Sequence, residues 1–168
     1  MNNTDKYIND LDLTRFNLFQ LGNNSGKTFY DTDDLPPLEE LFQDHVHYAI
    51  LHKRNPGTEV GHWVLLVRWS DTDFEYFDCL GFRAPFEVLT MLDDYSELHS
   101  QPLTLIESGR QLMNINNFIC GKWVMFRIMT LPNDLNTFYK FIDRITSKKV
   151  SADAIVNFMI NIPFKFTP

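Results

Sequence analysis

Hydrophobic and polar residues form distinct blocks along this chain, and the most strongly patterned block lies near its middle. Two runs rich in β-branched and aromatic residues, 63–69 and 74–79, flank the polar turn 70–73. Such runs on either side of a short polar turn are typical of an antiparallel β-hairpin. Both faces of this hairpin are apolar, so we expect helices to cover both of them.

The register of the hairpin decides whether two chemically useful residues meet. His62 stands at the start of the first run, and Asp78 stands at the end of the second. If Val64 lies opposite Asp78, then His62 and Asp78 share one face as diagonal neighbours, with Cβ atoms roughly 7–8 Å apart. A register slipped by one residue places them on opposite faces. The pattern alone leaves both registers open.

Weaker patterns predict the elements around the hairpin. A short helix is expected from Asp34 to Phe42, with Asp34 as its cap and two prolines in its first turn. A helix over 85–94 is expected to turn Phe86, Leu89 and Leu92 toward the core. Further strands are expected at 46–53 and 103–106, and further helices at 134–145 and 151–161.

The run 120–131 is apolar almost all round, which is typical of a helix in the middle of a core. Its first residue is Cys120. A thiol in the first turn of a helix lies at the positive end of the helix dipole, which favours the thiolate. Asn116 or Asn117 can cap that turn, and Gly121 lets a substrate backbone come close.

Cys120, His62 and Asp78 together make up the components of an activated nucleophile. A histidine held by a carboxylate can form an ion pair with a thiolate and later protonate a leaving amine. Such chemistry also needs an oxyanion hole. The backbone N–H of Cys120 and one side-chain amide from the preceding polar loop, Gln111 or Asn114, are the candidates.

Composition narrows the class of protein. At 168 residues, 44% of them hydrophobic, the chain is expected to form one α+β domain, 1–168, with a sheet in the middle and helices before and after it. A formal charge of −7 argues against strong nucleic-acid binding, which depends on Lys and Arg. Two cysteines favour a reducing compartment. Neither a signal-peptide pattern nor a membrane-spanning apolar run stands in the sequence, so a soluble, intracellular protein is expected.

Two further patterns are interpreted as ordinary structure. The segment 22–28 ends in Gly-Lys-Thr as a phosphate-binding loop does, but Leu21 stands where that motif needs its first glycine. The remaining histidines show no zinc spacing with cysteines, so no metal site is expected. These histidines are His45, His47, His52 and His99.

Three short segments carry the candidate residues, and their combination is more specific than any one of them. They are Gly61-His62-Trp63, Tyr76-Phe77-Asp78-Cys79-Leu80-Gly81 and Cys120-Gly121-Lys122-Trp123. The chain order His, Asp, Cys and the spacing between the first two resemble the adenain and SUMO-specific protease superfamily of cysteine peptidases. The resemblance spans roughly residues 45–131.

This resemblance implies a papain-like α+β fold with a rearranged order of elements. It also implies hydrolysis of peptide or isopeptide bonds after Gly-containing small-residue motifs, with Cys120, His62 and Asp78 as the catalytic residues. Trp63 and Gly121 would line the substrate cleft. Trp63 would pack on the catalytic histidine, although plain core packing explains this tryptophan equally well.

The compact size resembles viral capsid-maturation proteases of the adenain type, including those of virophages. The expected partner is therefore a capsid or other structural precursor protein, met by a monomeric enzyme in the host cytoplasm, the virus factory or the virion. Adenain uses DNA and a disulfide-linked viral peptide as cofactors. This chain is acidic and its spare thiol, Cys79, stands beside Asp78, so no cofactor is expected.

One departure from the family concerns the oxyanion hole. The family places a glutamine six or seven residues before the cysteine, where this chain has Asn114 and Met113. Gln111 lies further upstream, and its longer side chain favours it over Asn114. The alternatives to an endopeptidase are a SUMO-type isopeptidase, an acyltransferase on the same scaffold, and a non-catalytic binding module of this fold.

Overall fold

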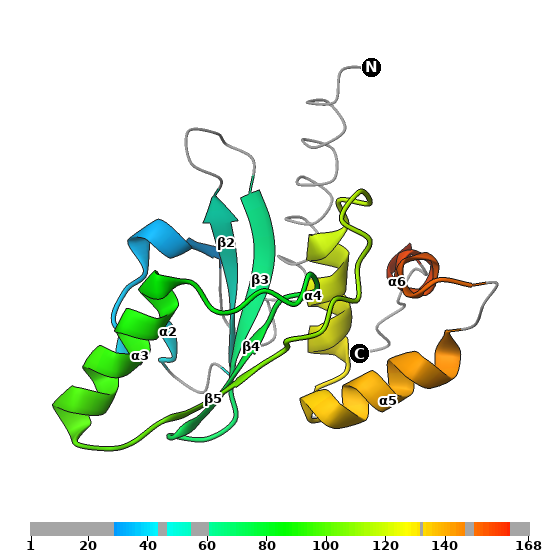
Figure 1. The fold of residues 1–168 in the computed structure, drawn as a ribbon. Helices are drawn as coiled ribbons and strands as arrows, with labels where there is room; N and C mark the ends of the chain where they lie inside the picture. The colour runs from blue at the N-terminus through cyan, green and yellow to red at the C-terminus, as the bar shows by residue number, and fades with distance from the viewer. Residues whose placement is uncertain (1–28, 44–46, 55–60, 132, 147–149, 162–168) are drawn as a thin grey trace, which may run out of the picture.

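A computed structural model describes residues 29–43, 47–54, 61–131, 133–146 and 150–161 (Figure 1). The strands are β1 (Phe29–Asp31), β2 (Tyr48–Arg54), β3 (Gly61–Arg68), β4 (Asp73–Phe77) and β5 (Thr104–Glu107). The helices are the 3-10 turn η1 (Thr32–Asp34) and α2 (Leu38–Leu41), α3 (Phe86–His99), α4 (Cys120–Met129), α5 (Leu135–Ile145) and α6 (Ala152–Asn161).

The five strands form one mixed sheet in the order β1-β2-β3-β4-β5. The central pairs β2–β3 and β3–β4 are antiparallel, whereas β1 and β5 join the edges in parallel. Helices α2 and α3 lie on one side of the sheet, and α4, α5 and α6 lie on the other (Figure 1). The predicted α+β fold, a mixed sheet with helices on both faces, is confirmed.

The observed hairpin register is the one that brings His62 and Asp78 together. Leu65 pairs with Phe77, and Leu66 pairs with Tyr76. Continued by one residue, this register sets residue 64 opposite residue 78. His62 and Asp78 therefore point to the same face, as the favourable alternative required.

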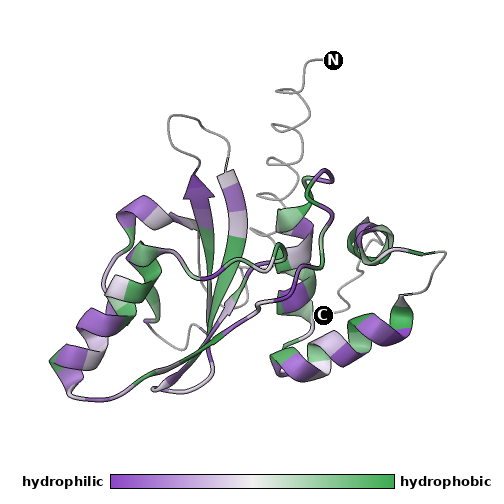
Figure 2. Ribbon diagram, in the orientation of Figure 1, coloured by the Kyte–Doolittle hydropathy of each residue, from purple (hydrophilic) through white to green (hydrophobic). Residues whose placement is uncertain are grey.

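Side chains alternate between the two faces of the sheet and form two separate hydrophobic cores, one on each face. On one face, Trp63, Leu65 and Phe77 pack with Trp123 and the rest of α4. On the other face, a second set of buried residues packs beneath α2 and α3. Its members include Val64, Leu66, Phe74, Tyr76, Val88, Met91 and Leu92. Because both faces are covered, β3 is buried from Trp63 to Val67 and is hydrophobic along its middle (Figure 2).

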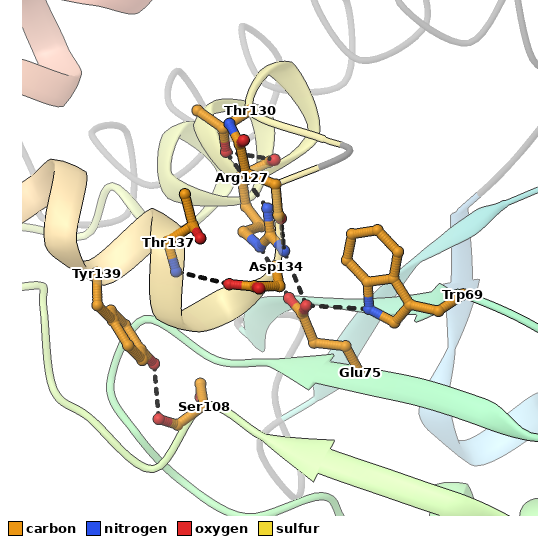
Figure 3. Close-up of polar contacts among 9 residues, drawn as sticks. Trp69, Glu75, Ser108, Arg127, Thr130, Asp134, Thr137 and Tyr139 are labelled. Atoms are coloured by element: carbon orange, nitrogen blue, oxygen red, sulfur yellow. Dashed lines mark hydrogen bonds and ion pairs between the residues drawn. The ribbon is translucent and has the colours of Figure 1, made fainter.

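Helix α4 is the central helix that the apolar run predicted, and it holds one fully buried charge. Arg127 is paired with Glu75 of β4, with both guanidinium–carboxylate distances at 2.8 Å and both residues at most 1% exposed (Figure 3). Trp69 donates its indole N–H to the same carboxylate at 3.2 Å. The Asn133 carbonyl accepts a further bond from Arg127 at 2.8 Å. This satisfied pair connects the sheet to α4 and to the turn before α5.

The prediction of a helix capped by Asp34 was wrong. Asp34 ends the 3-10 turn η1, and α2 begins at Leu38 with Pro37 as its N-terminal cap residue. The cause lies in the prolines, because a residue before proline is pushed out of the helical region. Leu35 accordingly has an extended backbone, with φ −78° and ψ 129°.

Helix α3 exists where it was predicted, but it is longer and turns a different face inward. It continues to His99 and ends at Ser100, whose left-handed backbone stops the helix. Its buried residues are Val88, Met91 and Leu92. Of the expected inward residues only Leu92 is buried, while Phe86 is 78% exposed and Leu89 is 39% exposed. The sequence of α3 has more than one apolar face, and the face that packs on the sheet is the one with Val88, Met91 and Leu92.

The two C-terminal helices agree with their predicted ranges, and α5 is capped as its sequence indicates. The Asp134 side chain accepts a hydrogen bond from the Thr137 N–H at 2.6 Å. The segment 22–28, with its partial phosphate-loop motif, lies outside the described residues. Within the described part of the chain, every helix is too short or too polar to cross a membrane.

Candidate active site

His62 and Asp78 form a short hydrogen bond at the end of the central hairpin. His62 Nε2 lies 2.7 Å from Asp78 Oδ1, and the Asp78 side chain is completely buried. The same Oδ1 accepts the Leu80 N–H at 2.7 Å. Ser108 holds the Asp78 backbone on both sides, accepting from its N–H and donating to its carbonyl. The carboxylate is thus fixed, and it fixes the imidazole in turn.

The start of β3 owes its position to a glycine. A Cβ atom on Gly61 would lie 2.5 Å from the Lys53 carbonyl and would also overlap the His52 ring. A larger residue would therefore push this end of β3 away from β2 and displace His62. His52 itself contacts the Trp63 ring in a tilted arrangement, with ring centroids 4.5 Å apart, and hydrogen-bonds Asp31 at 3.0 Å.

Cys120 is the first residue of α4 and contacts the start of β3. The Trp63 backbone N–H donates to the Cys120 sulfur at 3.5 Å. Cys120 is also near enough to His62 to contribute to the raised pKa of this histidine. Because Asp78 occupies Nε2, the other ring nitrogen, Nδ1, is left for the thiol. The structure thus places Cys120 at the start of the strand that carries His62, and the joint action of Cys120, His62 and Asp78 stays a prediction.

The electrostatics of His62 follow from these contacts. Burial lowers its pKa, but the hydrogen bonds to Asp78 and Cys120 and the negative charges of both groups outweigh burial and raise the pKa to about 9. The imidazolium is therefore the stable form at neutral pH. A protonated histidine beside a sulfur is the arrangement that supports a thiolate–imidazolium pair.

The second thiol, Cys79, has the opposite environment. Burial and the neighbouring Cys120 and Asp78 raise its pKa well above the ordinary value. Its sulfur contacts the Met113 sulfur at 3.8 Å in the core. His62, Asp78 and Cys79 offer ligand atoms within 4.8 Å of one another. A metal would need the Cys79 thiolate, which this environment disfavours.

The loop that carries Gln111 is attached directly behind Asp78. The Leu112 and Met113 N–H groups both donate to the Cys79 carbonyl, at 2.8 and 3.0 Å. Gly81 has a positive φ of 76°, and a Cβ there would lie 2.8 Å from the Gln111 nitrogen. Only glycine permits this approach. Gln111 donates its side-chain amide to the Met113 carbonyl at 3.1 Å, which leaves its second amide hydrogen for another acceptor.

Asn114 and the residues after it are held by a carboxylate from a distant helix. Asp153 of α6 is 5% exposed and accepts the Asn114 N–H at 2.9 Å and the Asn117 side-chain amide at 2.5 Å. Its other oxygen accepts the Trp123 indole N–H at 2.8 Å. The expected cap from Asn116 or Asn117 was wrong, because Ile119 is the cap residue of α4 and makes no side-chain cap bond. Asp153 instead secures the loop that leads to Cys120.

The two predicted cleft residues are both close to Cys120, and both are buried. Trp63 is 4% exposed and lies in the core with Trp123, and its backbone N–H contacts the Cys120 sulfur. Gly121 is buried in the first turn of α4. Their role toward substrate, and the choice between Gln111 and Asn114, stay predictions.

The sequence analysis did not predict two buried polar features, the Glu75–Arg127 pair and Asp153. Glu75 and Arg127 are opposite charges inside mostly apolar elements, and this pattern could have predicted a pair. Asp153 had no such signal. An acidic residue in the first turn of a helix is common for reasons of the helix dipole alone.

Comparison with known proteins gives a fold and no family. No known protein family matches the chain, and no curated protein matches its sequence. The crystal structure of the Se-Met ASFV pS273R protease aligns with a TM-score of 0.51 and 12% identity, covering 90% of this chain and 65% of that chain. Another ASFV pS273R protease structure aligns with a TM-score of 0.45 and 16% identity, covering 67% and 41%. The chain thus has a protease fold and spans less than two thirds of the length of either structure.

Proposed function

We propose that this chain is a cysteine protease in which Cys120 is the nucleophile, His62 the general base and acid, and Asp78 the residue that orients His62. The observation that carries the proposal is the 2.7 Å hydrogen bond between His62 and Asp78, beside Cys120, whose sulfur accepts the Trp63 N–H at 3.5 Å. The likeness to a protease fold supports it.

The geometry accounts for the acylation half of hydrolysis. The Cys120 sulfur attacks the scissile carbonyl carbon, and its S–C bond forms as the carbonyl π electrons move to oxygen. When the tetrahedral intermediate collapses, the C–N bond breaks and His62 gives its proton to the departing amine. With its pKa near 9, His62 holds that proton at neutral pH.

The deacylation half uses the same residues in reverse. Neutral His62 takes a proton from water, and the hydroxide attacks the thioester carbon. The C–S bond then breaks, the acid product leaves, and the thiolate–imidazolium pair is restored. Asp78 keeps the ring oriented through both halves, because its buried carboxylate holds Nε2 at 2.7 Å.

The negative oxygen of each intermediate needs donors. The first N–H groups of a helix lack partners within the helix, and α4 begins at Cys120. We assign the backbone N–H of Cys120 as one donor and the Gln111 amide as the other, with Asn114 as the alternative. The anchoring of the Gln111 loop to the Cys79 carbonyl, next to Asp78, supports Gln111.

The substrate is proposed to be a protein cut after Gly-containing small-residue motifs, and in a virus a capsid or other structural precursor. The family resemblance and the protease fold of an ASFV protein support this. The enzyme would then work as a monomer in the host cytoplasm, the virus factory or the virion, as an adenain-like or virophage-type maturation protease.

Sequencing the new C-termini produced from a peptide library tests the activity and the preference together. The wild type and the Cys79→Ala variant should cut after Gly, and Cys120→Ala should not cut. Cys79→Ala is the matched control because it removes the neighbouring thiol. Cleavage by Cys120→Ala, or its loss in Cys79→Ala alone, would refute the assignment, and cuts after large residues would refute the preference.

A further inference from the structure

A groove of about 460 Å³ lies on the side of the sheet opposite α4, between the η1–α2 segment and α3 (Figure 1). Its size is that of a ligand site. Apolar side chains form much of its wall, among them Leu35, Pro36, Phe86, Met91 and Leu98. The proposed hydrolysis uses none of these residues.

The outward face of α3 explains why this groove is open to a partner. Phe86 is 78% exposed and Leu98 is 74% exposed, and both line the groove. Hydrophilic and hydrophobic residues lie side by side along this helix (Figure 2). Large apolar side chains gathered at one exposed groove are typical of an interaction site.

The charges at the groove have one sign. Four carboxylate residues line it, and no Lys, Arg or His does among the described lining residues. The four are Asp33, Glu39, Glu87 and Asp94, and all are exposed. They are four of the 22 Asp and Glu residues of the chain. Carboxylates around an apolar floor complement an occupant that carries both cations and apolar groups.

The length of the groove favours an extended peptide. Phe86 and Leu98 are twelve positions apart on one helix, which at 1.5 Å per residue is about 18 Å. An extended chain covers that distance in five or six residues. We propose that the groove is a docking site for a segment of another protein in which large apolar side chains alternate with Lys or Arg. This site goes beyond the proposed hydrolysis and is independent of it.

A binding measurement on the Cys120→Ala protein tests the proposal without any dependence on catalysis. The probe is a fluorescein-labelled nine-residue peptide that alternates Lys or Arg with Phe or Leu, followed by fluorescence anisotropy. We expect saturable binding that the double variant Glu87→Lys/Asp94→Lys weakens roughly tenfold. Raising the salt concentration should weaken it too, because screening shortens the reach of exposed charges.

The chain supplies matched controls for charge and for fold. Asp93 is exposed on α3 next to Asp94 but does not line the groove, so Asp93→Lys should leave the affinity unchanged. Phe86→Ala changes no buried group and should weaken binding without unfolding the protein. A peptide with Glu in place of its cations should not bind.

Three results would overturn the proposal. The first is a probe that fails to saturate the protein at any concentration, and the second is an Asp93→Lys variant that weakens binding as much as Glu87→Lys/Asp94→Lys does. The third is a dimer that the Phe86→Ala variant dissociates in analytical ultracentrifugation. That result would assign the groove to a second copy of this chain.

Discussion

The charged residues beneath α4 and those beside α3 differ in their burial. Beneath α4, Glu75, Arg127 and Asp153 are buried, and every carboxylate oxygen among them has a donor. Beside α3, the carboxylates of Glu87 and Asp94 are exposed and line an open groove. The first arrangement fixes positions, because a buried charge cannot leave its partner without a large cost. The second keeps charges free to meet a partner.

The difference explains why Cys120 lies on the side of the sheet with the buried charges. Cys120 begins the helix that Arg127 anchors to the sheet, and Asp153 holds the loop before it. A nucleophile must be held within a fraction of an ångström of its base, and buried hydrogen-bonded charges hold it so. Docking of a flexible segment has no such requirement.

The largest loss of stability is expected from breaking the buried Glu75–Arg127 pair. Glu75→Ala leaves Arg127 charged and without its partner in the core, which should reduce the free energy of unfolding by about 3–5 kcal/mol. Urea denaturation followed by circular dichroism measures it. The double variant Glu75→Leu/Arg127→Met removes both charges and should recover most of the loss. Equal losses in the single and double variants would show that the charges are not a coupled pair.

A smaller loss of stability is expected from weakening the loop that leads to Cys120. In Asp153→Asn an amide group replaces one of the two carboxylate oxygens, so its N–H faces a donor that the oxygen had accepted from. The free energy of unfolding should therefore fall by about 1.5–3 kcal/mol. Alkylation of Cys120 should change in rate as well, because the loop before it loosens. Asp93→Asn, on the exposed surface of α3, is the control. An unchanged alkylation rate would mean that Asp153 stabilises the fold without positioning the site.

The His62 contacts should also give the stability a pH dependence. Its folded pKa of about 9 lies above its unfolded value of about 6.5, so its contribution is fully present below about pH 6.5. The contribution is lost as the pH rises through about 9. The difference in unfolding free energy between the wild type and His62→Ala should shrink accordingly between those values. A difference that stays constant would contradict the raised pKa.

The smallest effect is expected for an ion pair on the groove side. Glu39 and His99 form a hydrogen bond at 2.8 Å between side chains that are 47% and 42% exposed. Exposed pairs of this kind contribute less than about 1 kcal/mol. Glu39→Gln should therefore barely change urea denaturation, in contrast to Glu75→Ala. A loss as large as that of the buried pair would remove the distinction between the two faces.

The sequence predicted what local pattern and short-range chemistry determine. The hairpin, the central helix that begins at Cys120 and the two C-terminal helices all follow from apolar runs and their breakers. The favourable register of His62 and Asp78 was one of two that the pattern allowed, and packing on both faces selected it. Where several stripes of a helix were apolar, as in α3, sequence could not tell which would face the sheet.

Long-range polar contacts were the part that sequence could not supply. The edge strand β1 pairs with β2 from more than a dozen residues away, and only three residues take part. Asp153 meets the loop before Cys120 from the far end of the chain. Such contacts depend on tertiary packing and leave no periodic pattern.

The central claim is that His62 activates Cys120, and the rate of thiol alkylation tests it most directly. Iodoacetamide labelling at pH 6.5, followed by peptide mass spectrometry, distinguishes Cys120 from Cys79 in one experiment. We expect fast labelling of Cys120 in the wild type, much slower labelling of Cys120 in His62→Ala, and little labelling of Cys79 in either. Equal labelling of Cys120 with and without His62, or faster labelling of Cys79, would contradict it.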